Sequence, residues 1–182
     1  MKTPLRLLAA AWGFAEATLL FVVPDVLLSV LVLTRGWREG ALAALWAFAG
    51  ALLGGLLLYA WGSEDPETLF RLLDWLPAIS PGMLAEVRAN LAEGGAWSLI
   101  LAGVTGVPYK TYAASAAGAA MPLGSFLIAS AVARAGRFGL AVLLAAVLSR
   151  ILSRFVGTRG QLRILAGFWL VFYAAYWSLM PN

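Results

Sequence analysis

Five ionisable residues lie inside otherwise apolar stretches of this sequence. The two acids come early in the chain and the three bases late: Glu16, Asp25, Lys110, Arg134 and Arg137. A charge at the centre of a bilayer costs on the order of 3 kcal/mol or more unless it is paired or hydrated, so such residues are candidates for function. The basic residues predict a site for a phosphate group, and the acidic residues predict charge balance or a proton carrier.

Each of these residues also has a structural interpretation. The five charges can form an ion-paired core that only fixes the packing. Asp25 can instead cap a helix that begins beside it, because aspartate accepts from exposed backbone N–H groups. Arg134 and Arg137 share one helix face and can extend to the membrane interface. Tyr109 is a further candidate ligand, although packing is the commoner role of such a tyrosine.

The composition places these residues in a membrane protein. The chain has 182 residues, of which 62% are hydrophobic and 12% charged, and it contains neither cysteine nor histidine. That excludes disulfides, thiol nucleophiles and metal sites built from cysteine or histidine. The net charge of +4 comes from basic residues that flank apolar spans, which is a topology signal rather than a nucleic-acid signal. We predict an all-α integral membrane protein with one domain, residues 1–182, and with no metal, cofactor or nucleic-acid partner.

Two of the apolar segments are interrupted by proline. Residues 5–33 contain Pro24, and residues 96–120 contain Pro108. Proline removes a backbone donor and disfavours helix at the residue before it. Each segment is therefore predicted to be a re-entrant helical hairpin, with its irregular tip covered by protein or facing water.

The other segments predict three membrane spans and one loop. The spans are residues 41–61, 123–148 and 164–180, and the acidic residues 63–93 between the first span and the second hairpin predict an external loop with amphipathic helices. The first span carries glycines that predict close helix packing: Gly50, Gly54 and Gly55. The last span ends in an aromatic cluster typical of a membrane interface: Phe172, Tyr173, Tyr176 and Trp177.

Charge flanking the segments predicts their orientation. Basic residues gather at three places: Lys2 and Arg6, Arg35 and Arg38, and Arg150, Arg154, Arg159 and Arg163. By the positive-inside rule these places are cytoplasmic and residues 63–93 are external. The two hairpins then enter from opposite sides, as in transporters built from inverted repeats with a site near the midplane.

Several stretches resemble motifs of the DedA family, also called the VTT or SNARE-associated Golgi protein superfamily. Phe14-Ala15-Glu16-Ala17 and Val23-Pro24-Asp25-Val26-Leu27-Leu28 resemble its acidic first re-entrant motif, and residues 50–62 resemble the glycine-rich helix after it. The stretch Gly106-Val107-Pro108-Tyr109-Lys110-Thr111-Tyr112 resembles the family's second re-entrant motif. The run 133–138 looks like the end of the family's module in a small bacterial subgroup. The resemblance covers roughly residues 10–150. Thr105 and Thr111 stand where many members carry arginine, so Lys110, Arg134 and Arg137 are expected to supply the positive charge instead.

The resemblance implies two opposed re-entrant hairpins in a bacterial cytoplasmic membrane protein. Family members are associated with phospholipid scrambling, with flipping of undecaprenyl phosphate and with dependence on the proton motive force. The leading hypothesis is thus a lipid translocase whose basic residues attract the headgroup of an anionic phospholipid or polyprenyl phosphate. A proton- or ion-coupled transporter of a small solute and a non-transporting assembly factor are alternatives, and a homo-oligomer is possible. An enzyme is disfavoured because no Walker-type loop or dense carboxylate cluster is present.

Overall fold

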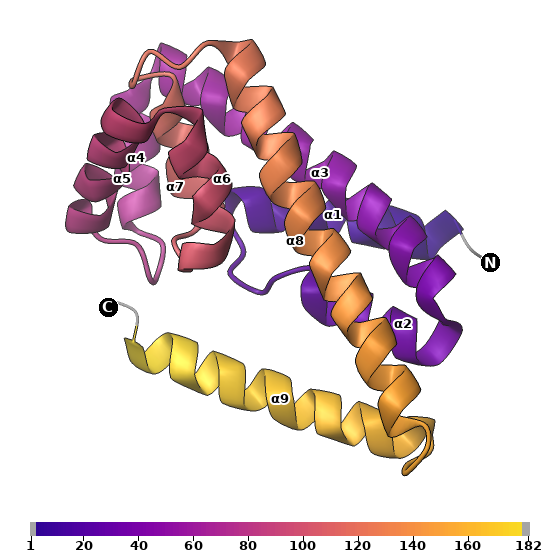
Figure 1. Cartoon of the computed structure of the whole chain (residues 1–182). Coiled ribbons are helices and arrows are strands. Elements are labelled where there is room, and N and C mark those ends of the chain that lie inside the picture. The colour runs from indigo at the N-terminus through magenta and orange to yellow at the C-terminus, as the bar shows by residue number, and fades with distance from the viewer. Residues whose placement is uncertain (1–2, 180–182) are drawn as a thin grey trace.

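The computed structural model describes residues 3–179, and the side chains of Val104 and Thr105 are outside that description. The described residues form helices and contain no strand, which confirms the all-α prediction. In chain order the helices are α1 (Thr3–Thr18), α2 (Asp25–Arg35), α3 (Trp37–Glu64), α4 (Pro66–Asp74), α5 (Pro81–Gly94), α6 (Ala96–Thr105), α7 (Tyr109–Ala116), α8 (Leu123–Leu152) and α9 (Thr158–Leu179). Figure 1 shows α3 and α8 crossing at the centre, with α9 set apart below them.

Three helices within the described range are long and apolar enough to cross a membrane: α3, α8 and α9. They coincide with the three predicted spans. The last of them begins at Thr158 rather than at residue 164, and Met180, its predicted end, lies outside the described residues. Among the described residues of α9 only Gln161 is buried, so most of its apolar surface faces outward.

Both segments that contain a central proline are broken helices. The first break covers residues 19–24, and the second covers residues 106–108. Gly106, in the second break, has a φ of 83°, a left-handed conformation that favours glycine. Helix α1 ends at Thr18, well before the predicted end near Val23, so the first break is longer than the proline alone requires. Each segment is a helix–break–helix unit.

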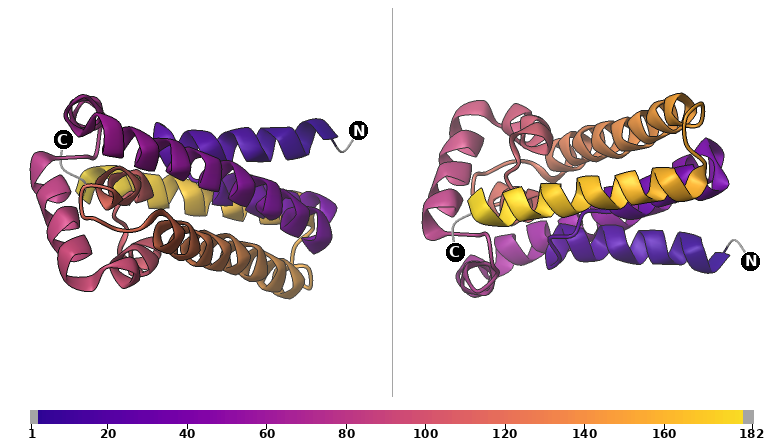
Figure 2. Two further views of the ribbon diagram at one scale, coloured as in Figure 1. Left: turned by 90° about the horizontal axis from the view of Figure 1, so that it is seen from above. Right: turned by 90° about the horizontal axis from the view of Figure 1, so that it is seen from below.

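The acidic segment folds into two short helices at one end of the molecule. In α4 the apolar residues Leu69 and Leu73, which are four apart on one helical face, are buried. Leu72, which the sequence groups with them at helical spacing, is exposed instead. Figures 1 and 2 place α4 and α5 at the end away from the N-terminus and from the α2–α3 and α8–α9 turns. The basic turns thus share one end and the acidic helices lie at the other, as the charge distribution predicts. Lys2 lies outside the described residues.

The start of α4 is expected to lose stability in acid. The Thr68 N–H donates to Oδ1 of Asp65 at 3.1 Å, and this hydrogen bonding by Thr68 lowers the pKa of Asp65 below its ordinary 3.8. The ionised carboxylate favours the folded helix, so its contribution is present above pH 3.8 and is lost as the pH falls through the lowered pKa. Hydrogen exchange of α4 amides, corrected for intrinsic rates, should rise in that acidic window. Asp65→Asn keeps an acceptor and should remove the pH dependence, and a dependence that persists contradicts this explanation.

Close packing of α1 on α3 depends on glycine. A Cβ at Gly50 would collide with the backbone carbonyl of Ala10, and a Cβ at Gly13 would collide with the carbonyl of Ala47. Gly54 lies against the backbone of Phe14, so one face of α3 receives α1 as the glycine pattern predicts. This contact fixes where the end of α1, with its acidic residue, meets the rest of the bundle.

Gly50→Ala is expected to destabilise the fold by about 1–3 kcal/mol, because the added methyl group meets backbone that cannot rotate away. The matched control is Gly136→Ala on α8, where an added Cβ meets nothing within 4 Å. The control should be neutral or slightly stabilising, since alanine is the better helix former. Thermal unfolding in detergent measures both, and equal stability of the two variants contradicts the prediction.

Candidate functional site

A buried ion pair joins the middle of α8 to the end of α1. Nη1 of Arg134 lies 3.0 Å from Oε2 of Glu16, and both side chains are buried. The guanidinium carbon of Arg134 also lies 3.9 Å from the centroid of the Tyr109 ring on α7. The buried Nε and Nη2 of Arg134 have no hydrogen-bond partner in the described structure. Arg134 is therefore held by one carboxylate and one ring and retains unused donors.

A second ion pair lies one helical turn further along α8. Nε of Arg137 donates to Oδ2 of Asp25 at 3.1 Å. Asp25 is buried and its Oδ1 has no partner in the described structure, whereas the side chain of Arg137 is 29% exposed. Asp25 is the first residue of α2, after the N-cap Pro24, and neither of its carboxylate oxygens accepts from a backbone N–H of the described residues, so the alternative that it caps this helix is wrong. Its carboxylate is engaged by Arg137 instead.

Lys110 binds the break between α1 and α2. Its Nζ donates to the carbonyl oxygen of Leu20 at 2.7 Å and lies 3.9 Å from the centroid of the Phe21 ring. Lys110 is 2% exposed, and no carboxylate of the described residues is within ion-pair distance of it. The second broken segment therefore supplies a cation to the irregular backbone of the first.

The structure brings all five charged residues singled out in the sequence to the first break. The acids flank it on α1 and α2, and the bases reach it from α7 and α8. No family model, curated protein or solved structure matches this chain. These five residues, which are Glu16, Asp25, Lys110, Arg134 and Arg137, are called the charge cluster.

The remaining predicted site residues support the cluster from its rim. The Tyr109 hydroxyl donates to Oγ of Ser130 at 2.9 Å, which fixes the ring beneath Arg134. Pro24 and Pro108 lie directly before α2 and α7, as predicted for the two breaks. Arg134 is buried in the middle of α8, so the alternative that it extends to the interface is wrong. The side chain of Thr105 lies outside the described residues.

Aromatic residues of α9 also contact the first break. The Tyr173 hydroxyl accepts from the backbone N–H of Val23 at 2.9 Å, and the rings of Phe21 and Trp177 lie 5.9 Å apart. Trp169 donates from Nε1 to Oγ of Ser29 at 3.2 Å. The local sequence pattern places Tyr173 and Trp177 in an interface belt and does not indicate these contacts. The available signal was the break itself, because its free N–H groups need acceptors from elsewhere in the chain.

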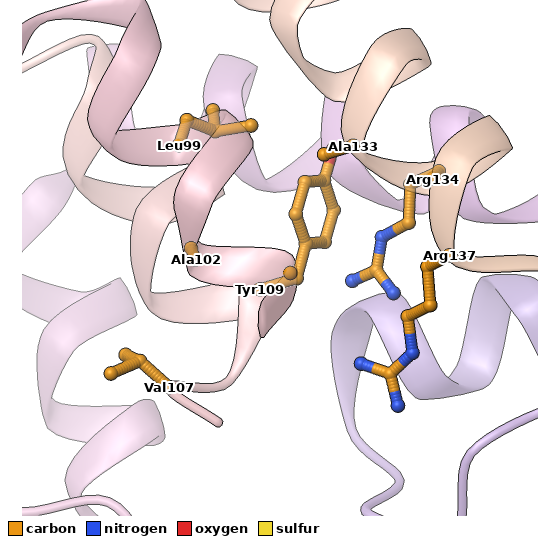
Figure 3. A pocket seen from close by; sticks show the side chains of 8 residues that line it. Leu99, Ala102, Val107, Tyr109, Ala133, Arg134 and Arg137 are labelled. Carbon is orange, nitrogen blue, oxygen red and sulfur yellow. The ribbon is translucent and has the colours of Figure 1, made fainter. Parts of the chain in front are cut away.

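Space beside the ion pairs is small. A cavity of about 10 Å³ lies between α6, α7 and α8, and this volume is about what one water molecule needs. Figure 3 shows Arg134 and Arg137 extending from α8 beside Tyr109, with Leu99 and Val107 at the rim. A lipid headgroup does not fit in this closed arrangement. Arg134 is closed off from the surface, whereas the side chain of Arg137 is 29% exposed.

Proposed function

We propose that this protein moves an anionic lipid, a phospholipid or a polyprenyl phosphate, from one membrane leaflet to the other. The observation that carries the proposal is the pair of intramembrane arginines held by two carboxylates beside a break in the helices. Removing charges from water costs several kcal/mol per ion, and apolar residues of similar volume often give equal or better stability. If these residues served packing alone, apolar side chains would stabilise a chain with three apolar spans as well as two buried ion pairs do.

The proposed mechanism is an exchange of anions at the arginines. Guanidinium binds carboxylate and phosphate through the same planar donors, so a phosphate can replace Glu16 or Asp25 as the partner. The unused donors of Arg134 favour such an exchange, because they are already buried and unpaired. The displaced carboxylate takes up a proton or water, and the hydrocarbon chains stay in the bilayer. Proton uptake at this step would couple movement to the proton gradient.

The arrangement of the two broken segments supports this proposal. We infer that α1–α2 and α6–α7 are opposed re-entrant hairpins, since the Lys110 bond to Leu20 joins their irregular parts. In inverted-repeat transporters, broken helices meet at the midplane and form the site there. The resemblance to DedA-family motifs points to the same arrangement, to lipid as the cargo and to the bacterial cytoplasmic membrane as the location.

The test is transport by the purified protein in liposomes. Labelled phosphatidylglycerol and a labelled polyprenyl phosphate are followed between leaflets with and without a pH gradient, beside protein-free vesicles. Movement of either lipid that depends on the protein supports the proposal, and a response to the gradient shows coupling. A folded, correctly inserted protein that moves neither lipid overturns it.

A transporter for a small solute is the second candidate. The cavity beside Arg134 and Arg137 admits a molecule about the size of water, which suits a small anion or a proton path better than a headgroup. Uptake of inorganic phosphate into the same vesicles, and competition by phosphate against lipid movement, distinguish the two candidates. If neither lipid nor solute moves, the non-transporting assembly role is favoured.

A further inference from the structure

A groove lined only by apolar residues runs between α3 and α8. The groove has a volume of about 510 Å³, far larger than the cavity beside the ion pairs. Small residues open it, among them Ala44 on α3 and Gly139 on α8. The buried Phe138 lines the groove and lies 6.0 Å from the guanidinium carbon of Arg134, so its ring separates the groove from the charge cluster.

The length of the groove matches one leaflet. Its lining extends from Trp37 to Phe48 on α3 and from Ala135 to Ala146 on α8. Each stretch advances by eleven residues, which at the rise of an α-helix is roughly 16 Å. Half of a hydrocarbon core of about 30 Å is nearly the same length. Helices α3 and α8 run antiparallel, so Trp37 and Ala146 mark the same end of the groove (Figures 1 and 2).

Positive charge and an aromatic anchor lie at that end. Trp37 is 60% exposed, and the guanidinium carbon of Arg38 lies 5.7 Å from the centroid of its ring. Arg35 and Arg150 are exposed at the adjacent ends of α2 and α8. Tryptophan and arginine at a membrane interface favour anionic headgroups, and the groove beyond them contains no polar side chain.

We propose that this groove binds one hydrocarbon chain of an anionic lipid, with the lipid phosphate against Arg38 and Arg150. The chain enters beside Trp37 and reaches toward Ala135, along one leaflet. This binding site goes beyond the proposed transport, because it is occupied whether or not the lipid crosses the membrane. Phe138 would then place the bound chain one aromatic ring away from Arg134.

The test is photo-crosslinking in phosphatidylcholine vesicles that contain phosphatidylglycerol with a diazirine at the end of one acyl chain. Because the reactive group is at the end of the chain, peptide mapping is expected to find the label at the inner end of the groove, near Phe48 and on the stretch 135–139. Gly139→Leu fills the groove and should reduce this labelling several-fold. Gly136→Leu is the matched control, since both glycines are exposed on α8 with open space at Cβ, but only Gly139 lines the groove. Equal labelling of the two variants overturns the proposal.

The headgroup is tested with Arg38→Gln, an exposed substitution that leaves the groove unchanged. It should lower labelling by the phosphatidylglycerol probe toward that of a phosphatidylcholine probe with the same chain. Equal labelling of wild type by the two probes overturns the anionic preference.

Ala44→Cys in this cysteine-free chain tests whether a second copy of the protein covers the groove. Efficient disulfide dimers in vesicles would show that it does. Labelling needs no transport, so its outcome is independent of the liposome assay.

Discussion

Glu16→Gln is expected to abolish lipid movement and also to destabilise the protein. The substitution leaves the charge of Arg134 buried without its carboxylate, beside the rings of Tyr109 and Phe138. Removing one partner of a buried ion pair costs about 3–5 kcal/mol. A carboxylate that only carries protons could be neutralised without such a loss. Lipid movement in liposomes and thermal unfolding in detergent are measured on the same preparation.

A double variant separates function from packing. Glu16→Leu combined with Arg134→Met replaces the pair by apolar side chains of similar size, a change that is often neutral or stabilising. The double variant is expected to unfold at or above the wild-type temperature and still to move no lipid. If it is stable and transports normally, the ion pair only fixes the packing and the exchange mechanism is wrong.

Much of the helix arrangement is predictable from local sequence patterns. The long apolar runs give α3, α8 and α9 because span length follows directly from hydropathy. Both prolines mark breaks because the missing N–H acts locally. The early end of α1 at Thr18 is different, since no residue there stops a helix. It depends on partners from distant segments, Lys110 at the Leu20 carbonyl and Tyr173 at the Val23 N–H.

The members of the charge cluster are predictable from the sequence, but the way they pair is not. An ionisable residue in an apolar segment is conspicuous in sequence, so all five charges can be picked out without a structure. Which acid binds which base depends on how α8 is rotated against α1 and α2, and local patterns do not contain this rotation. The same applies to Ser130, which holds the Tyr109 hydroxyl, because a single serine in a helix carries no signal of its partner.

Lys110→Met is expected to reduce movement of anionic lipid at least as strongly as removing the charge of Arg134 or Arg137 would. The protein is expected to stay folded. Methionine keeps much of the buried apolar volume but removes the charge and the donor to Leu20. The unpaired carbonyl costs roughly 1–3 kcal/mol, less than a buried unpaired charge. The matched control is Ser115→Ala, also buried on α7, whose Oγ has no partner in the described structure. The control should keep wild-type transport.

The choice of lipid shows what Lys110 does. If its charge attracts the phosphate, Lys110→Met should slow phosphatidylglycerol more than phosphatidylcholine, because only the first carries a net negative charge that the ammonium can attract. If Lys110 serves only to hold the Leu20 carbonyl, both lipids should slow equally and in step with the fall in unfolding temperature. Lys110→Arg adds a further distinction, since it keeps the charge but must reach Leu20 with a longer, planar group. A Lys110→Arg variant that retains the preference for phosphatidylglycerol while losing stability would assign the selectivity to charge and the folding role to the hydrogen bond.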